Sequence, residues 1–169
     1  MTDISLLNGW RVFSMDNTAT ILTTGTHLKK RNFRNIYTVI YELLDGARDQ
    51  IHLVTYVITD NAMWLVDLLE KNLRRGRSVK FIVNELNPSL KITKRLYRLD
   101  KKYDNFTLIE FQKKYPGETI HAKLIVVDRK KAVIGSMNFT WGGMVGNHEV
   151  GVLVEGPDIE DLAYTLDMI

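Results

Sequence analysis

The stretch HAKLIVVDRKKAVIGSMN, residues 121–138, says most about the fold and chemistry of this chain. It contains a His-x-Lys pair, an aspartate after four further residues, and Gly-Ser-x-Asn after six more. Chemistry at a phosphodiester requires a nucleophile or acid, a fixed cation and neutral hydrogen-bond donors around one phosphorus atom. The residues of these types here are His121, Lys123, Ser136 and Asn138. The stretch therefore indicates a site suited to a phosphate group.

The same stretch predicts two strands and a loop. Residues 121–127, with an apolar run at 124–127, are predicted to form a strand, and residues 131–134 a short return strand. Residues 128–130 connect the two. The loop that follows carries Ser136 and Asn138, and Gly135 before them permits a tight approach of the backbone.

Strand geometry places the first pair of residues together. Side chains two apart on a strand share a face, so His121 and Lys123 are expected to converge. Asp128 has the opposite parity, which favours a structural role. An unpaired ammonium beside an apolar run is costly, so Lys123 is expected to have an anionic ligand or a carboxylate partner. A substrate phosphate meets that need.

Outward from this stretch, helical and extended periodicities alternate along the chain. The predicted helices cover residues 36–47, 60–73, 90–103 and 158–166, with Asp60 as the N-cap of the second. The remaining predicted strands cover residues 51–58, 79–83, 107–111 and 149–154. This alternation predicts an α/β fold with a mixed, mostly parallel sheet flanked by helices on both sides.

Length and composition limit what the site can be built on. A chain of 169 residues, 45% of them hydrophobic, is about one domain in size. We expect an N-terminal extension over residues 1–33, a hairpin or strand of the same domain, and a catalytic domain over residues 34–169. Cysteine is absent, which excludes thiolate catalysis and cysteine-ligated zinc. The sequence offers no membrane span or signal peptide, so a cytoplasmic protein is expected.

Charge is distributed unevenly along the chain. Residues 147–169 contain six acidic residues and no Lys or Arg, so the remainder holds 23 basic and 14 acidic residues. This asymmetry favours a polyanionic partner such as nucleic acid. The predicted helix 90–103 places six cations at neighbouring helical positions, where like charges repel unless a polyanion or counter-ion binds. These candidates are Lys91, Lys94, Arg95, Arg98, Lys101 and Lys102. A solvated helix face is the alternative interpretation.

A His-x-Lys pair alone carries little information. His27-Leu28-Lys29 repeats the pair, but Arg34 stands where the aspartate is required, and no Gly-Ser follows. His27 is therefore expected in a surface loop. His52 lies inside an apolar strand and is expected to be a hydrogen-bonded core histidine.

With every position in register, the chain resembles the phospholipase D superfamily, whose signature is H-x-K-x4-D-x6-G-S-x-N. That family also has an acidic residue on the strand after the motif, and Glu149 occupies that place. The resemblance implies that Glu149 orients a catalytic histidine, that Lys123 and Asn138 bind the phosphate, and that Ser136 supports the site. Glu149 in a salt bridge or at a solvated strand end is the alternative.

The resemblance also implies a two-step reaction without a metal or other cofactor. One histidine attacks phosphorus, a second protonates the leaving oxygen, and water hydrolyses the phosphohistidine. Because the chain contains one complete motif, the resemblance implies a homodimer with the two His121 residues across its two-fold axis.

Small single-motif members of the superfamily are often endonucleases, which with the charge distribution favours DNA or RNA as substrate. Trp141 could stack on a base or pack at a dimer interface. Two alternatives stay open: a phospholipase D or transphosphatidylase acting on lipid, and a catalytically silent nucleic-acid-binding or scaffold protein.

Overall fold

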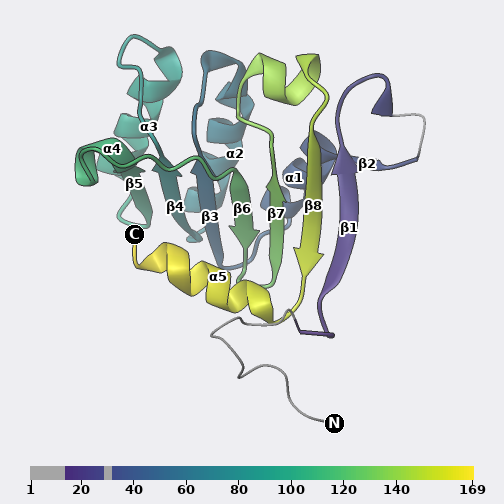
Figure 1. The fold of residues 1–169 in the computed structure, drawn as a ribbon. Coiled ribbons are helices and arrows are strands. Elements are labelled where there is room, and N and C mark those ends of the chain that lie inside the picture. The colour runs from purple at the N-terminus through teal and green to yellow at the C-terminus, as the bar shows by residue number, and fades with distance from the viewer. Residues whose placement is uncertain (1–13, 29–31) are drawn as a thin grey trace.

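The computed structural model describes residues 14–28 and 32–169 and is built on one eight-stranded sheet (Figure 1). The strands are β1 (Thr18–Thr23), β2 (Arg34–Asn35), β3 (Gln50–Thr55), β4 (Ser78–Val83), β5 (Phe106–Glu110), β6 (Leu124–Val127), β7 (Lys131–Gly135) and β8 (Val150–Glu155). Their order across the sheet is β2-β1-β8-β7-β6-β3-β4-β5. The helices are α1 (Ile36–Asp45), α2 (Met63–Arg74), α3 (Lys91–Lys102), α4 (Phe111–Lys114) and α5 (Asp158–Asp167), with a 3₁₀ turn η3 (Asp60–Ala62) and a π-helix η4 (Gly142–Gly146).

The sheet is mixed, as predicted, but it is not mostly parallel. Three strand pairs are parallel and four are antiparallel. The reason is the connectivity: β3, β4 and β5 are linked through helices α2 and α3, whereas β6 and β7 are joined by a tight turn. A short turn can only reverse the chain, so this half of the sheet is antiparallel.

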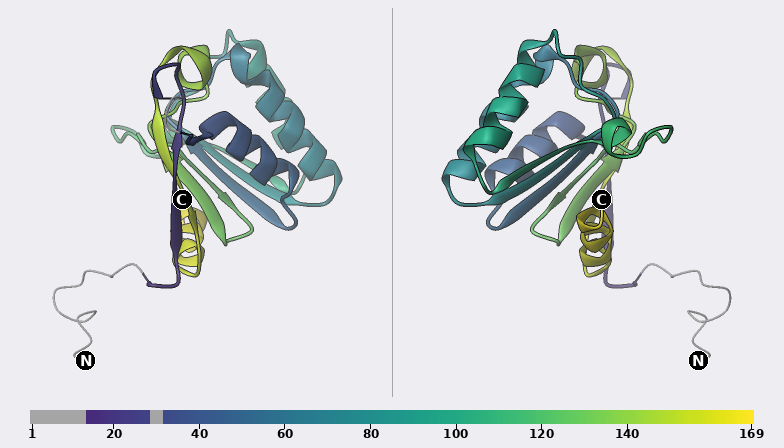
Figure 2. Two further views of the ribbon diagram at one scale, coloured as in Figure 1. Left: turned by 90° about the vertical axis from the view of Figure 1, so that its right-hand side faces the viewer. Right: turned by 90° about the vertical axis from the view of Figure 1, so that its left-hand side faces the viewer.

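Helices flank the sheet on both sides, which confirms the predicted layers. Helices α1, α2 and α3 cover one face, and α5 crosses the other near one end of the strands (Figures 1 and 2). The larger core fills the space under the three helices and includes Phe81, Leu53 and Leu69. The smaller core lies under α5 and includes Ile159 and Val126.

The segment expected to be an N-terminal extension contributes a strand to this sheet. Strand β1 pairs antiparallel with β8 along its whole length and parallel with the short β2. The turn at Asp16 and Asn17 does not lead into a hairpin within the described residues, because the neighbours of β1 are β8 and β2. Residues 1–13 lie outside the described part of the chain.

The turn between β6 and β7 explains why the motif contains an aspartate. Asp128 and Arg129 both have positive φ values, 53° and 55°, and the Lys130 N–H donates to the Val127 carbonyl oxygen at 3.1 Å, which closes a tight turn between the two strands. The Asp128 carboxylate accepts hydrogen bonds from the backbone N–H groups of residues 48–50 at 2.8–3.2 Å. Asp128 therefore anchors the turn to the loop before β3, at the opposite end of β6 from His121.

Two local predictions differ from the structure. The strand expected from residue 121 begins at Leu124, because neighbouring β3 ends at Thr55 and β7 at Gly135, leaving residues 121–123 with one backbone contact, from Gly135 N–H to the Lys123 carbonyl. Asp60 does not cap its own helix; its carboxylate accepts the Ile92 N–H at 2.8 Å and caps α3 instead. The tertiary contact between Asp60 and α3 thus overrides the local capping pattern of the sequence.

Candidate active site

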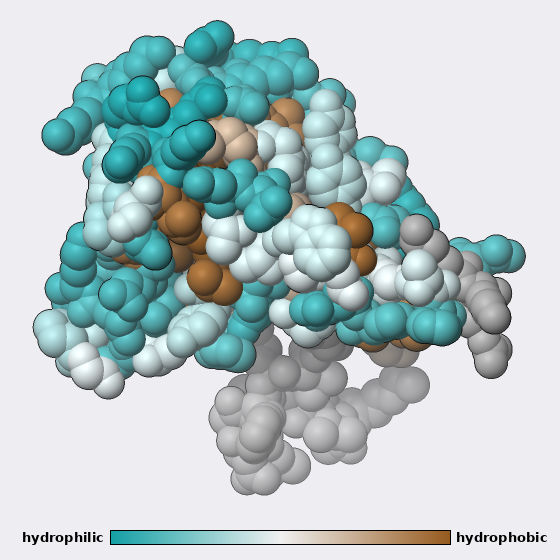
Figure 3. Space-filling view, turned by 90° about the horizontal axis from the view of Figure 1, so that it is seen from above, coloured by the Kyte–Doolittle hydropathy of each residue, from teal (hydrophilic) through white to brown (hydrophobic). Residues whose placement is uncertain are grey.

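The motif residues other than Asp128 gather at one end of the sheet. Strand β3 ends there, and residues 121–123, the end of β7 and the start of β8 surround it, with η4 above (Figure 1). Figure 3 looks directly onto this end, which is largely hydrophilic with separate hydrophobic areas between the polar side chains. The site is thus an open surface built from segments distant in sequence.

His121 and Lys123 converge, as the strand spacing predicted. The Lys123 Nζ lies 2.9 Å from Nδ1 and 3.1 Å from Nε2 of the His121 ring, and donates to the His121 carbonyl oxygen at 2.7 Å. The pair thus places a cation beside a ring that can act as a nucleophile. His121 itself is exposed, so its ring is accessible to a substrate.

Lys123 is a partly buried cation without an ion-pair partner among the described carboxylates. Burial lowers the pKa of its ammonium, and the more distant Glu149 carboxylate offsets part of this effect. The sequence predicted an anionic ligand or a carboxylate partner here; within the described chain the carboxylate is near but not in contact. An anion placed beside His121 would remove this electrostatic cost.

Ser136 and Glu149 are brought together by the pairing of β7 with β8. The Ser136 hydroxyl donates to the Glu149 carboxylate, which also accepts from the Asn147 side-chain amide at 3.1 Å. Glu149 is only 9% exposed and makes no hydrogen bond to His121 of its own chain. The Glu149 carboxylate therefore has Ser136 and Asn147 as partners, and a contact to a catalytic histidine stays a proposal.

Asn138 lies at the junction of the motif loop and the segment after β3. Its side-chain oxygen accepts the Val57 N–H at 3.4 Å, which directs the amide NH₂ away from the backbone. An isolated parallel bridge between Ile58 and Phe139 holds these two segments together. The amide donors of Asn138 are thus positioned by backbone contacts on both sides.

The glycine-rich segment after the motif, residues 142–146, is the π-helix η4. Gly143 is required there because a Cβ atom would lie 2.3 Å from the Asn138 carbonyl oxygen. Gly135 has a similar role, since its Cβ would be 2.9 Å from the Val150 carbonyl oxygen. Trp141 precedes η4 and is 59% exposed, with its ring packed over Gly146. Single π-helical turns are frequent at functional sites.

Two aromatic contacts at the site were not predicted. The Tyr56 ring lies 4.7 Å from the His121 ring, and the Lys123 Nζ lies 5.5 Å from the same tyrosine. The only sequence signal was an aromatic residue directly after the buried strand β3. The centroids of the His27 and His148 rings lie 5.1 Å apart in a stacked arrangement, and both residues are exposed. His27 therefore lies in a surface loop, as predicted.

His52 is a buried core histidine, as expected. Its Nε2 lies 2.7 Å from the Asp167 carboxylate on α5, far along β3 from the motif. His52 is therefore bound to the C-terminal helix α5.

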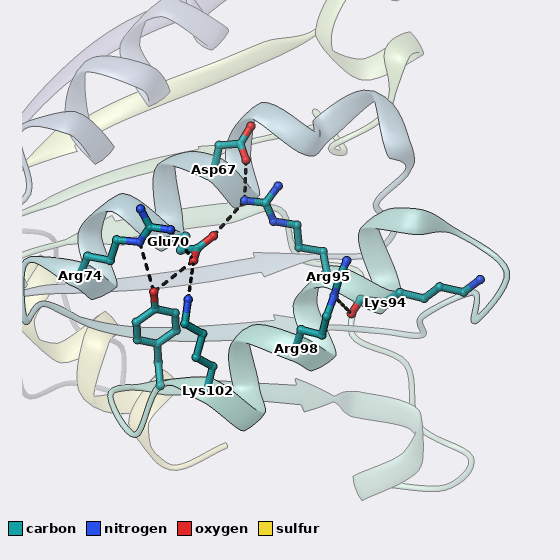
Figure 4. Close-up of polar contacts among 8 residues, drawn as sticks. Asp67, Glu70, Arg74, Lys94, Arg95, Arg98 and Lys102 are labelled. Atoms are coloured by element: carbon teal, nitrogen blue, oxygen red, sulfur yellow. Dashed lines mark hydrogen bonds and ion pairs between the residues drawn. The ribbon is translucent and has the colours of Figure 1, made fainter.

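The basic helix α3 is partly neutralised by the protein itself (Figure 4). Arg95 pairs with Asp67 at 2.8 Å and with Glu70 at 2.9 Å, and Lys102 pairs with Glu70 at 3.1 Å. These two cations brace α3 against α2. The candidates outside this network are exposed and available to a ligand: Lys91, Lys94, Arg98 and Lys101.

Glu70 is the centre of the network. Burial alone raises the pKa of its carboxyl group, but hydrogen bonds from Arg95, Arg74, Lys102 and Tyr103 outweigh it and lower the pKa from 4.5 to about 2. A lowered pKa in the folded state contributes stability above the unfolded pKa, and this stability is lost as pH falls through the folded pKa.

Replacing Glu70 by glutamine is expected to lower the free energy of unfolding by about 2 kcal/mol at pH 7, less than the full shift implies because Arg74 and Lys102 are largely exposed. The difference in free energy of unfolding between the variant and wild type should shrink as pH falls from about 4.5 to about 2. Urea denaturation across this range measures it. Glu42→Gln, which removes an exposed pair with Arg34, is the control and should cost under about 0.5 kcal/mol. Equal losses in both variants would contradict the bracing role.

The fold and the motif together define a member of the phospholipase D superfamily of phosphodiesterases. The chain belongs to the family described as "Cardiolipin synthase, PLD-like domain", whose model matches residues 40–166. It is similar to the DISARM protein DrmC of Bacillus paralicheniformis, with 27% identity over 126 residues, 75% of this chain and 52% of that protein. It is also similar to a phospholipase D of Rickettsia bellii, with 29% identity over 122 residues, 72% of this chain and 57% of that protein. The chain spans little more than half the length of these curated relatives.

Two solved structures share the fold. NucT from Helicobacter pylori superimposes with a TM-score of 0.68 at 15% identity, covering 90% of this chain and 94% of NucT. Nuc from Salmonella typhimurium, a phospholipase D family member, gives 0.67 at 19% identity, covering 89% and 92%. Both likenesses support a single mixed sheet flanked by helices.

Two surveys of the described residues complete the description. Over residues 14–28 and 32–169, no helix has the length and apolar character needed to span a bilayer. Over the same residues, no group of three or more His, Asp or Glu side chains is arranged to hold a metal ion. Metal independence and a cytoplasmic location stay predictions.

Proposed function

We propose that the protein is a metal-independent endonuclease that hydrolyses DNA or RNA phosphodiesters through a phosphohistidine at a site shared by two copies of the chain. The observation that carries this proposal is the convergence of the Lys123 ammonium on the exposed His121 imidazole. That ammonium is partly buried and has no carboxylate partner among the described residues. The chain belongs to a superfamily of phosphodiesterases, which supports reaction with a phosphodiester at this pair of residues.

The first chemical step follows from the positions of these groups. A substrate phosphate draws the Lys123 ammonium from the imidazole, and a ring nitrogen of His121 forms a bond to phosphorus. The bond from phosphorus to the leaving oxygen breaks, and a second histidine gives that oxygen its proton. The Lys123 ammonium and the Asn138 amide stabilise the charge on the nonbridging oxygens. Water then attacks the phosphohistidine, releases the phosphate product and returns His121.

The second histidine has to come from elsewhere. Of the four histidines in the chain, His52 is bound to Asp167, and the rings of His27 and His148 stack on each other. His121 of a second copy is the remaining source. A two-fold axis beside the site would bring both His121 rings to one phosphate.

Nucleic acid is favoured over lipid by the exposed cations of α3 and by the charge asymmetry of the sequence. A phospholipase D or transphosphatidylase is the second candidate, favoured by the names of the Rickettsia relatives and by apolar side chains exposed beside the site, among them Trp141, Ile134 and Val150. A catalytically silent binding protein is disfavoured because the motif residues keep a compact arrangement.

The test is incubation of the protein with plasmid, single-stranded DNA, RNA and phosphatidylcholine vesicles in excess EDTA. The proposal expects cleavage of at least one nucleic acid without added divalent ions and a covalent phosphoenzyme, stable to alkali and labile to acid, trapped by rapid quenching. Lipid turnover without nucleic-acid cleavage would establish the second candidate instead. Strict dependence on a divalent ion would contradict the mechanism.

Substrate contacts by α3 lead to a separate prediction. The double substitution Lys94→Gln/Arg98→Gln should weaken binding of single- and double-stranded DNA to a similar degree, because phosphate contacts carry no sequence information. The slope of log affinity against log salt concentration should fall by about 2. The control Lys71→Gln/Lys131→Gln removes the same charge from pairs with Asp45 and Glu155 and should leave that slope unchanged. Fluorescence anisotropy over a salt series distinguishes the two.

A further inference from the structure

Strand β3 ends where the motif residues gather (Figure 1), and Tyr56 is the first residue after it. The last two residues of the strand, Val54 and Thr55, are fully buried, whereas Tyr56 is 38% exposed. The aromatic side chain therefore leaves the core at this point and enters the open surface of the candidate active site.

The Tyr56 ring contacts both members of the His-x-Lys pair. Its centroid lies 4.7 Å from the centroid of the His121 ring, and the two ring planes are tilted by 53°. The Lys123 Nζ lies 5.5 Å from the Tyr56 centroid, inside the range of about 6 Å for cation–π contacts. Because the same Nζ lies 2.9 and 3.1 Å from the two His121 ring nitrogens, the three side chains form a closed triangle.

The His121 ring has few contacts to hold it. Over residues 14–28 and 32–169, its only hydrogen-bond partner is Lys123 and its only ring contact is Tyr56. In the proposed reaction the ammonium moves to the substrate phosphate, so the contact with Lys123 is lost as the imidazole attacks. Tyr56 is then the contact within the described chain that still limits rotation of this exposed ring.

The backbone of Tyr56 is fixed on both sides. The Thr55 hydroxyl donates to the Val57 carbonyl oxygen at 3.1 Å, which closes the chain across Tyr56. The Val57 N–H donates to the Asn138 side-chain oxygen at 3.4 Å. One short segment thus holds the Asn138 amide through its backbone and meets His121 through the Tyr56 ring. A ring on a fixed backbone can hold a neighbouring side chain in one orientation.

The ring of Tyr56, and not its hydroxyl, makes these contacts. The hydroxyl has no hydrogen-bond partner among the described residues. An aromatic ring offers a negative face to an ammonium and a flat surface to another ring. Phenylalanine keeps both properties, and an aliphatic residue of similar size has neither. Substitution can therefore separate the ring from the hydroxyl.

We propose that Tyr56 is a positioning residue whose ring holds the His121 imidazole in the orientation from which it attacks phosphorus. The attack itself rests on the proposed function, whereas the packing of the two rings is independent of it. Reacting atoms have to lie about 3–3.5 Å apart with their orbitals aligned, so a ring held in one orientation reacts faster than one that rotates. Tyr56 acts through His121 and forms no bond to the substrate.

The kinetic experiment compares Tyr56→Leu with Tyr56→Phe. Tyr56→Leu should lower kcat by about 10- to 100-fold and change KM by less than about 3-fold, because the phosphate still binds while the nucleophile is misoriented. Tyr56→Phe should stay within about 3-fold of wild type in both constants. The matched control is Tyr41→Leu, the same change at a 45% exposed tyrosine on α1, which should leave both constants unchanged.

NMR spectra of the histidine rings give a readout that needs no catalysis. The ring current of Tyr56 displaces the Cε1–H resonance of His121, so this resonance should shift in Tyr56→Leu and keep its position in Tyr56→Phe. The resonances of His27, His52 and His148 should not move, and His121→Ala identifies the signal. Tyr56→Met takes the place of Tyr56→Leu in both experiments should the leucine variant unfold.

The outcomes separate this inference from the proposed function. Equal losses of kcat in Tyr56→Phe and Tyr56→Leu would overturn the inference, because the hydroxyl would then be the active group. Full kcat in Tyr56→Leu would overturn it as well. In a protein that cleaves no phosphodiester, a His121 resonance that shifts in Tyr56→Leu alone would support the positioning of the ring while the proposed function fails. An unchanged resonance would overturn the inference.

Discussion

His121→Ala is expected to lower kcat/KM for phosphodiester hydrolysis by about 10³- to 10⁴-fold or more, which corresponds to about 4–5.5 kcal/mol of transition-state stabilisation. The effect is large because the substitution removes the atom that bonds to phosphorus. In a shared site it also removes the acid that the second copy needs. No phosphoenzyme should form in the variant.

The chain offers a matched control for this experiment. His27→Ala makes the same change in the second His-x-Lys pair, whose histidine is exposed and stacked on His148. It should keep activity within a few-fold of wild type. Thermal unfolding of both variants checks that the fold is intact, because His121 is exposed and its removal creates no cavity. Activity that survives in His121→Ala would refute the mechanism.

Lys123→Met is expected to change activity and stability in opposite directions. Methionine keeps the length of the side chain and removes the charge, so kcat/KM should fall by about 10²- to 10³-fold as the phosphate loses its cation. The folded protein should gain about 0.5–1 kcal/mol, a rise in Tm of about 1–4 °C, because an ammonium without a carboxylate partner among the described residues no longer has to be partly buried.

The opposite signs make this prediction specific. A purely structural lysine would lower both quantities when removed. The comparison is Lys80→Met, since Lys80 is also partly buried but its ammonium donates to the Asp167 carbonyl oxygen of α5 at 2.8 Å and so joins two distant segments. The Lys123 ammonium donates only to His121, two residues away. Lys80→Met should retain activity and lose stability. Steady-state kinetics and differential scanning calorimetry on the same preparations provide both measurements.

Much of the fold was predictable because its signals are local. Helices α1, α2, α3 and α5 and the strands of the core follow periodicities that depend only on neighbouring residues. The prediction of a mostly parallel sheet was wrong for the same reason. The alternation of helices and strands can be read along the chain, but the antiparallel pairing of β6 with β3 and of β7 with β8 cannot. Strand β1 pairs with β8, the last strand of the chain, and this place comes from the sheet as a whole.

The surface around the site was less predictable. Six cations on α3 have identical sequence signals, yet Arg95 and Lys102 face Glu70 on α2 while Lys94 points away. Tyr56 reaches His121 only because β3 and β6 are adjacent in the sheet. Across four strands the sheet aligns the apolar residues 21, 152, 134 and 124, which no window along the sequence would group.

The sequence by itself determined the motif, its phosphate chemistry, the convergence of His121 with Lys123 and the layered α/β architecture. Each of these follows from residue type and from spacing along a single strand or helix. Only the tertiary structure decided that Asp128 anchors a turn at the far end of β6, that Glu149 binds Ser136, and which cations stay exposed. Those outcomes depend on which strands and helices become neighbours, and that is set by burial of the whole core.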